Sequence, residues 1–312
     1  MIEYDELSLI LERYGIDPKT VINNNANVLI KGEYKDIETT IKYLVEELNI
    51  SPKNIEKAPS IMYLNVSAIK RNVKYLKKQN ITFSNIETCL HVLSTKPEKL
   101  EETFNYIKDN YGIEYINKVT SILKVDIERI KEIEKLNLDK KIVISAACSN
   151  LKVNEISKVI KVCKENNIEI TGRVFLKSAK EIEKIIKVCK ENNITITGSI
   201  FLKTSEKLIE SIDFIKDNYA LSYLTSLIII KDVKYLKEVF PYLEEMGVLE
   251  VVKKSASILS LSLEEIKERK EFIESINEPL VLDNGRFNSI FGMSRKRYLK
   301  KVNDILSSNR QM

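Results

Sequence analysis

Apolar residues recur along most of the chain at spacings of three and four, which is the period of an amphipathic α-helix. The segment 182–189 shows the pattern clearly, because Ile182, Ile185, Ile186 and Cys189 fall at i, i+3, i+4 and i+7. The alternation of apolar and polar residues that would indicate strands is nowhere sustained. We therefore expect an all-α protein.

A shorter apolar cluster precedes each long periodic segment. The cluster VFL at 174–176, for example, is about one helical turn long. Such clusters are followed by residue types that cap helix N-termini, namely Asn65, Ser178, Thr204 and Ser205. Each unit is thus predicted to be a short helix, a turn and a longer helix, and the paired asparagines that end some units favour the left-handed turn that closes a helix.

One unit is repeated almost letter for letter. The segment KVIKVCKENNIEITG at 158–172 returns as KIIKVCKENNITITG at 184–198, 26 residues later. Similar units begin near Pro59, His91, Thr120, Ala146, Arg173, Ser199, Thr225 and Ser255. Their spacing is 26 residues in the middle of the array and 29 to 34 toward its ends, and periods of this size are typical of stacked helical repeats.

A unit of this size cannot bury its apolar face alone, so neighbouring units must share a continuous core. We predict an α-solenoid of about eight to ten two-helix repeats of 26–34 residues. The predicted organisation is an N-terminal capping helix within 1–27, the repeat array over 28–288 and a basic helical segment over 289–312. The acidic stretch from about Tyr4 to Tyr14 is the expected cap.

Cations recur on the predicted long helices. Lys70, Arg71, Lys74, Lys77 and Lys78 lie at i, i+1, i+4, i+7 and i+8, and so occupy about a third of a helix circumference. The matching positions in the duplicated units are Lys158, Lys161, Lys164, Lys184, Lys187 and Lys190. Stacked helices would join these rows into one basic surface.

The charge of the chain is unevenly distributed. Residues 59–224 hold 28 Lys and Arg against 21 Asp and Glu, whereas residues 225–288 hold 9 against 12. The unit over 255–276 carries Glu268, Glu271 and Glu274 at the positions of the cations of the first unit, so it would repel phosphate and is a candidate contact for a protein partner. A basic surface with acidic flanks suits a polyanion that follows a defined path.

The last 24 residues, 289–312, are again basic, with six Lys and Arg against one acid. The candidate contacts here are Arg295, Lys296, Arg297, Lys300 and Lys301. A short helix, the turn FGMS and a helix opened by Ser294 resemble the latter half of a helix-turn-helix, and a basic helix that closes the solenoid fits the same letters.

The sequence lacks most of the residue patterns that carry catalysis. Its one histidine, His91, lies in the apolar run CLHVL, and it has no HExxH, no Cys/His metal spacing and no phosphate-binding glycine loop. We expect no catalytic residue, no metal and no cofactor, although a hydrolase that uses carboxylates alone stays open. The four cysteines, Cys89, Cys148, Cys163 and Cys189, form no CxxC pair and are interpreted as buried hydrophobic residues.

No apolar run approaches the ~18 residues that a bilayer crossing needs. The N-terminus shows neither a signal-peptide core nor an Arg-rich transit pattern. We therefore expect a cytoplasmic protein that does not span a membrane.

The stretch PSIMYLNVSAIKRNVKYLKKQNI resembles the repeat of the mitochondrial transcription termination factor family. The fit rests on Pro59, Ile61, Ile69, Val73, Tyr75, Leu76, Asn80 and Ile81. The unit SASILSLSLEEIKERKEFIESI fits again through Ile258, Leu259, Ile266, Phe272 and Ile273, with Ala256 in place of the proline. The likeness covers most of residues 28–290. It implies a superhelical stack that lays a basic concave side along double-stranded DNA, or along RNA in some members, without catalysis.

We therefore expect a non-enzymatic nucleic-acid-binding protein with a role in transcription or replication control. The scarcity of Arg, 9 against 41 Lys, argues for phosphate contacts over base readout. Two alternatives stay open at this stage. Lysine is ordinary on a solvated helix face, so the array could instead be a protein-interaction scaffold, or it could bind RNA.

Overall fold

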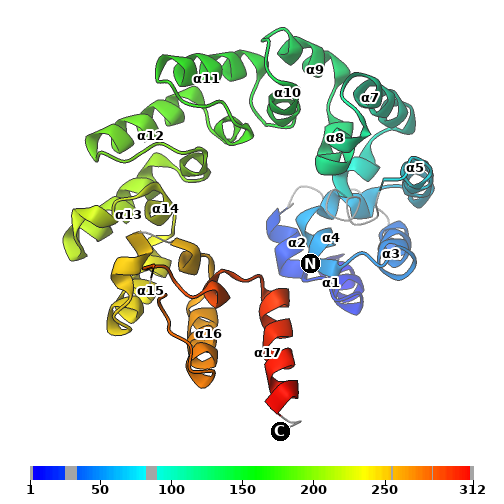
Figure 1. Ribbon diagram of the computed structural model, residues 1–312. Coiled ribbons are helices and arrows are strands. Elements are labelled where there is room, and N and C mark those ends of the chain that lie inside the picture. Colours follow the sequence, from blue (N-terminus) through cyan, green and yellow to red (C-terminus); the bar gives the residue numbers. More distant parts are fainter. Residues whose placement is uncertain (1–2, 25–33, 82–89, 254–255, 283, 310–312) are drawn as a thin grey trace. The chain divides into compact units, whose positions relative to one another are not determined.

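The computed structural model describes residues 3–24, 34–81, 90–253, 256–282 and 284–309. Within these ranges the regular secondary structure is helical, and Val281 and Phe287 form an isolated antiparallel bridge. This confirms the prediction of an all-α protein. The chain divides into two compact units, unit 1 (Met1–Val153) and unit 2 (Asn154–Met312) (Figure 1).

The described helices of unit 1 begin with α1, which nearly matches the predicted N-terminal helix. In chain order they are α1 (Glu3–Arg13), α2 (Pro18–Asn24), α3 (Tyr34–Lys42), η1 (Tyr43–Glu47), α4 (Pro52–Lys57), η2 (Pro59–Tyr63), α5 (Val66–Lys78), η3 (Leu90–Ser94), α7 (Pro97–Asn110), α8 (Ile113–Lys118), η4 (Thr120–Lys124), α9 (Ile127–Glu134) and α10 (Lys140–Ala147). The segment η1 is π-helical and the other η segments are 3₁₀ helices.

Unit 2 continues the same kind of helix series. Its described helices are α11 (Val153–Glu165), η5 (Gly172–Leu176), α12 (Ala179–Glu191), η6 (Gly198–Leu202), α13 (Ser205–Asn218), η7 (Leu221–Tyr223), α14 (Ser226–Ile229), α15 (Val233–Glu245), η8 (Leu249–Lys253), η9 (Ala256–Ser260), α16 (Leu263–Ser275), η10 (Ser289–Gly292) and α17 (Arg295–Asn309).

A short helix followed by a long one recurs in both units, as the apolar pattern predicts. The short element is in most cases a five-residue 3₁₀ helix, such as η5 or η6, and the long one is an α-helix of 13 or 14 residues, such as α12 or α13. The two near-identical segments fold into α11 and α12 with the connectors that follow them. The duplication is therefore a duplication of a structural unit.

Local side-chain chemistry sets the helix starts. Asn65 accepts a hydrogen bond from the Ser67 N–H at 2.8 Å, and Ser178 and Thr204 cap α12 and α13 in the same way. The prediction is wrong for Ser205, which is the first residue of α13 and is buried. Thr204 already occupies the cap position, so Ser205 has no capping role.

Asparagine closes several of the helices. Asn167 and Asn193, the second asparagines of the two copies, have φ of 53° and 54°, as predicted. The same left-handed conformation occurs at Asn49, Asn80, Asn137 and Asn277. Asparagine tolerates this region better than most other residues with a Cβ, so the helices that precede these asparagines end at a defined residue.

The spacing of the repeats varies because some repeats contain an additional short helix. In unit 1, α4 precedes η2 and α8 precedes η4. In unit 2, η8 precedes η9, whereas the connectors 168–171 and 194–197 of the 26-residue repeats contain no helix. The longer periods toward the ends of the array thus come from inserted helical turns.

Successive elements of one kind pack against each other within each unit. In unit 2, α12 contacts α13 and α13 contacts α15 (Figure 1). Among the short helices of this unit, η5 contacts η6, η6 contacts α14 and α14 contacts η9. The long helices thus form one row and the short helices a second row. The core lies between the rows, where Phe175, Ile182, Ile185 and Phe201 are buried.

Polar side chains on the long helices hold the carbonyls that end the next short helix. Asn72 of α5 donates to the carbonyls of Leu93 and Thr95 at 3.0 and 2.8 Å. Ser211 of α13 donates to the Lys231 carbonyl at 3.0 Å. These carbonyls have no partner inside their own short helix, so the bonds fix each short helix against the long helix before it.

Two arginines make the same kind of contact more extensively. In unit 1, Arg129 of α9 donates to the carbonyls at the end of α10, those of Ala146 and Ala147, and to the carbonyls of Ser149 and Leu151 in the segment that follows. In unit 2, Arg269 of α16 is 1% exposed and donates to the carbonyls of Ile290, Phe291 and Met293. These are charge-assisted bonds, so they contribute more than neutral ones.

Candidate nucleic-acid interface

The cations predicted on α5 all lie at the surface of unit 1. Arg71, Lys74 and Lys78 are exposed and form no ion pair with any described carboxylate. Lys70 lies 3.5 Å from a Glu47 carboxylate oxygen and 4.6 Å from the centre of the Tyr43 ring. Lys77 is exposed as well. One side of α5 therefore presents cations to solvent.

The lysines of α11 lie in unit 2 and are exposed too. The ammonium of Lys158 lies 3.6 Å from Glu155, and that of Lys161 lies 3.8 Å from Glu165. Lys164 is exposed without a described carboxylate partner. Two of the three predicted cations on this helix are thus loosely paired with acids of the same helix.

The row on α12 has the same arrangement, as the duplicated sequence requires. Lys187 lies 3.8 Å from Glu191, and Lys184 is exposed without a described carboxylate partner. Lys190 donates to the Asn166 side-chain oxygen at 2.8 Å and so links α12 to the end of α11. The two rows belong to neighbouring helices of one unit.

A groove of about 390 Å³ runs between α11 and α12 and gathers some of these cations. Its charged lining is Glu155, Lys158, Lys161, Glu165, Lys180 and Glu183. The carboxylate of Glu155 accepts a hydrogen bond from the backbone N–H of Ala179 at 2.8 Å, at the start of α12. The Glu155 carboxylate in the groove is therefore bound to the N-terminus of α12, where the helix dipole favours a negative charge.

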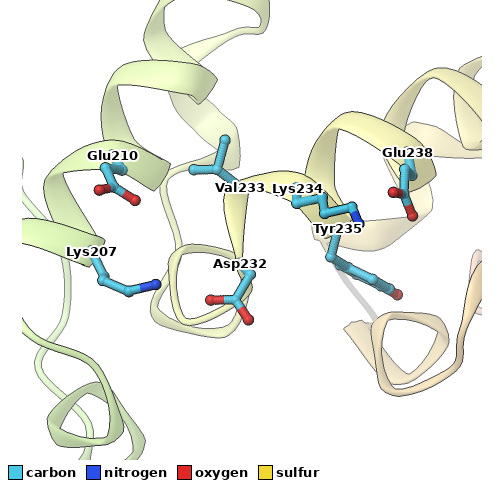
Figure 2. A pocket seen from close by; sticks show the side chains of 7 residues that line it. All are labelled: Lys207, Glu210, Asp232, Val233, Lys234, Tyr235 and Glu238. Atoms are coloured by element: carbon cyan, nitrogen blue, oxygen red, sulfur yellow. The ribbon is translucent and has the colours of Figure 1, made fainter.

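A second groove, of about 520 Å³, lies between α13 and α15 and has mixed charge. Figure 2 shows the Lys207 ammonium and the Asp232 carboxylate pointing toward one another, while Lys234, Tyr235 and Glu238 project from α15. Asp232 also pairs with Lys203, and this hydrogen bond lowers the pKa of the Asp232 carboxyl group. With Glu210 opposite, this groove offers no excess of positive charge.

The C-terminal cations are partly engaged inside unit 2. Arg295 pairs with Glu268 of α16, and the bond raises the pKa of Arg295. Lys301 lies 3.9 Å from Glu278. The other predicted contacts of α17, Lys296, Arg297 and Lys300, are exposed.

The acidic repeat over 255–276 also forms ion pairs inside the chain. Besides the pair of Glu268 with Arg295, Glu274 pairs with Lys270 at 2.8 Å. Glu271 is exposed. Of the three glutamates predicted to repel phosphate, two therefore hold neighbouring cations. Ser255, where this unit was expected to begin, lies outside the described residues.

Among the described residues, the groups with catalytic potential are His91 and the acidic side chains. His91 is half-buried, and burial together with Lys124 lowers its pKa. The described residues contain no group of three or more His, Cys, Asp or Glu that could hold a metal ion. Hydrogen bonds lower the pKa of Asp126 and Asp232, which is opposite to the shift that a general acid needs.

Burial accounts for the described cysteines of the repeats. Cys163 and Cys189 are buried and free, and burial raises the pKa of each thiol to about 11, as expected for structural cysteines. Cys148 is half-buried and its sulfur accepts a hydrogen bond from the Ser121 hydroxyl at 3.7 Å, and Cys89 lies outside the described residues. None of the described helices combines the length and apolar character needed to cross a bilayer.

The half-buried Arg129 and the buried Arg269 are not identified by the sequence pattern. The signal that could have identified Arg269 is its place in the repeat: seven residues after the N-cap Ser262, where Asn72 and Ser211 follow Asn65 and Thr204. A polar residue at this otherwise apolar helix position marks a side chain that reaches the next short helix.

No protein-family model matches the chain, and no curated protein matches it either. The likeness to the mitochondrial transcription termination factor repeat therefore stays a prediction from the sequence.

Proposed function

We propose that this protein is a non-enzymatic α-solenoid that binds nucleic acid, with double-stranded DNA as the first candidate and a role in transcription or replication control. One observation carries the proposal. Exposed cations recur on the long helices α5, α11 and α12, at positions set by the repeat. A polymer of regularly spaced phosphates is the ligand that such a recurring charge fits.

The ion pairs on these helices do not oppose binding strongly. The side chains of Lys158, Lys161 and Lys187 are 65%, 75% and 76% exposed. The carboxylates paired with them lie 3.6 to 3.8 Å away. Exposed pairs of this kind contribute about 0–1 kcal/mol each. A phosphate can therefore replace the carboxylate as partner at small cost.

The stacking within each unit supports the solenoid part of the proposal. Long helices contact long helices and short helices contact short helices, which is how a repeat array extends. That the rows on α5, α11 and α12 face one concave side stays a prediction. The auxiliary contacts are the exposed cations of α17.

The test variant combines Arg71→Glu, Lys74→Glu and Lys187→Glu, so it changes cations in both units. The matched control reverses three exposed lysines outside the predicted rows, Lys53→Glu, Lys118→Glu and Lys234→Glu. Both variants lose six units of charge, so a difference between them reports position and not net charge. The measurement is retention of a duplex DNA of random sequence in a gel-shift titration, with duplex RNA in parallel.

The proposal expects the first triple variant to lose DNA retention and the control variant to keep most of it. Equal affinity of the two variants would remove the proposed rows. Tighter binding of RNA than of DNA by the unmodified protein would reassign the ligand to RNA.

A further inference from the structure

The short-helix row of unit 2 carries exposed leucines at its surface. Leu176 ends η5 and is 59% exposed, and Leu202 ends the neighbouring η6 and is 51% exposed. Leu227, in the adjoining α14, is 51% exposed. Because η5 contacts η6 and η6 contacts α14, these three residues belong to consecutive packed elements. We call them the leucine strip.

The fold does not require leucine at the end of a short helix. The residue after the two buried apolar positions is Leu176 in η5 and Leu202 in η6, but Ser94 in η3, Lys124 in η4 and Ser260 in η9, and all of these are exposed. Polar residues therefore satisfy the same backbone position. The leucines leave apolar surface in water, which marks a contact site more often than a structural need.

The strip is bordered by positive charge. The three segments that carry it, 172–178, 198–204 and 225–231, contain four basic residues and no Asp or Glu: Arg173, Lys177, Lys203 and Lys231. In a 3₁₀ helix, residues three apart share a face, so Arg173 and Leu176 lie on the same side of η5.

One acid approaches the strip from the next element, since Asp232 pairs with Lys203. It does not neutralise the rest of the border. Lys231 is half-buried, and burial together with the nearby Lys203 lowers its pKa, so an anionic partner at this point would relieve repulsion. Arg173 is exposed and pairs with no described carboxylate.

We propose that the leucine strip docks an acidic peptide segment of a partner protein, with apolar side chains on Leu176 and Leu202 and carboxylates on Arg173, Lys177 and Lys231. The cations alone would suit a nucleic acid, but a phosphate backbone gains nothing from leucine. A peptide that alternates acidic and apolar residues matches both features. This site uses none of the lysines proposed to hold phosphates, so it is a second surface.

The probe is a fluorescein-labelled 12-residue peptide that alternates glutamate and leucine, and binding is followed by fluorescence anisotropy. Two further peptides act as references, one with serine in place of leucine and one with lysine in place of glutamate. The Glu-Leu peptide is expected to bind at least about tenfold more tightly than either reference, because each lacks one of the two matched features.

The test variant is Leu176→Ser with Leu202→Ser, since serine occupies this position in η3 and η9. It is expected to lose at least about tenfold in affinity for the Glu-Leu peptide while its thermal midpoint changes little, because both side chains are already exposed. Leu9→Ser is the control, since Leu9 is 63% exposed and lies on α1. It is expected to bind like the unmodified protein. Arg173→Glu with Lys177→Glu is expected to weaken the same binding.

Several results would overturn the proposal. One is equal binding of the Glu-Leu and Glu-Ser peptides, and another is unchanged affinity in the double serine variant. Displacement of the bound peptide by a single-stranded oligonucleotide, with loss of oligonucleotide binding in the serine variant, would assign the strip to nucleic acid. Self-association of the unmodified protein that the serine variant abolishes in sedimentation would assign it to a second copy of the chain.

Discussion

The carboxylate of Glu155 on α11 accepts a hydrogen bond from the backbone N–H of Ala179, the first residue of α12. One repeat later, Glu181 on α12 accepts from the N–H of Ser205, the first residue of α13, at 2.5 Å. The first N–H groups of a helix have no partner inside it, and the helix dipole favours a negative charge at that end. Helix α11 therefore caps α12, and α12 caps α13.

Removal of this contact is expected to destabilise unit 2. Glu181→Ala should lower the free energy of unfolding by about 1 kcal/mol, which is the usual cost of a lost N-terminal capping contact. Glu155→Ala should act in the same way and by a similar amount. Urea denaturation followed by far-UV circular dichroism measures both. Glu183→Ala is the control, because Glu183 is exposed on the same helix as Glu181 and bonds to no described residue. Equal stability of the Glu181 and Glu183 variants would contradict the capping role.

A second prediction concerns the asparagines with positive φ. Asn193 has φ of 54°, a region that costs a residue with a Cβ about 1–2 kcal/mol and costs glycine little. Asn193→Ala is thus expected to destabilise by about 1 kcal/mol, whereas Asn193→Gly should stay within about 0.5 kcal/mol of the unmodified protein. Urea midpoints of the two variants compare them directly. An alanine variant as stable as the glycine variant would show that the left-handed turn is not maintained.

Arg269 is expected to be among the most sensitive positions of unit 2. Its guanidinium donates to three carbonyls of the η10 region and lies 4.9 Å from the centre of the Tyr298 ring. Arg269→Ala leaves these carbonyls without their donor and opens a cavity, so a loss of about 3 kcal/mol is expected. Arg269→Lys should fall between, since one ammonium cannot reach all three carbonyls. Arg297→Ala, at an exposed position, is expected to change stability by less than about 0.5 kcal/mol. A loss below 1 kcal/mol in Arg269→Ala would contradict the structural role.

The sequence predicts the local structure of this chain well and its interactions between repeats poorly. The stripe Ile182, Ile185 and Cys189 identifies α12, and the cap Ser178 fixes its start, because both signals lie within one helix. The hydrogen bond from the Ser205 N–H to the Glu181 carboxylate joins residues 24 apart. The sequence next to Glu181 does not distinguish this capping glutamate from one that is simply exposed to solvent. Such contacts depend on how two helices meet, which the pattern of one helix does not contain.

The cations of the candidate site differ in the same way between positions set within one helix and contacts between helices. The sequence correctly places Arg71 and Lys74 on the exposed side of α5, since the buried positions Ile69, Val73 and Leu76 leave only that side free. It does not predict that Glu268 pairs with Arg295, because that pair joins residues 27 apart on two different helices, α16 and α17. The repeat over 255–276 therefore has less unpaired negative charge at its surface than its sequence predicts.

Stability at alkaline pH should depend on two tyrosines that share Glu134. Tyr111 donates to a Glu134 oxygen at 2.5 Å and Tyr106 at 3.0 Å. Burial and this hydrogen bond raise the pKa of Tyr106 to about 12, and the same causes raise the pKa of Tyr111 further. The folded state thus keeps protons that the unfolded chain loses near pH 10. The stabilisation is complete below about pH 10 and decreases as pH rises above it.

This decrease can be isolated with phenylalanine. The double variant Tyr106→Phe and Tyr111→Phe removes both titrating hydroxyls, so its urea midpoint should fall less between pH 9 and pH 11 than that of the unmodified protein. Tyr14→Phe is the control, because the Tyr14 hydroxyl bonds to no described residue. An equal fall in the double variant would show that other groups cause the alkaline loss.

The salt dependence of DNA binding is the sharpest test of the proposed phosphate contacts. If about six cations engage duplex DNA, the logarithm of the affinity should fall against the logarithm of the salt concentration with a slope near −5. Lys74→Ala should make this slope shallower by about one and weaken binding to all duplex sequences alike, because lysine neutralises phosphate without reading bases. Lys53→Ala, on an exposed lysine of α4, should leave the slope unchanged. A slope near zero in the unmodified protein would mean that phosphate charge does not drive association, and the cations of α5, α11 and α12 would then be ordinary solvated side chains.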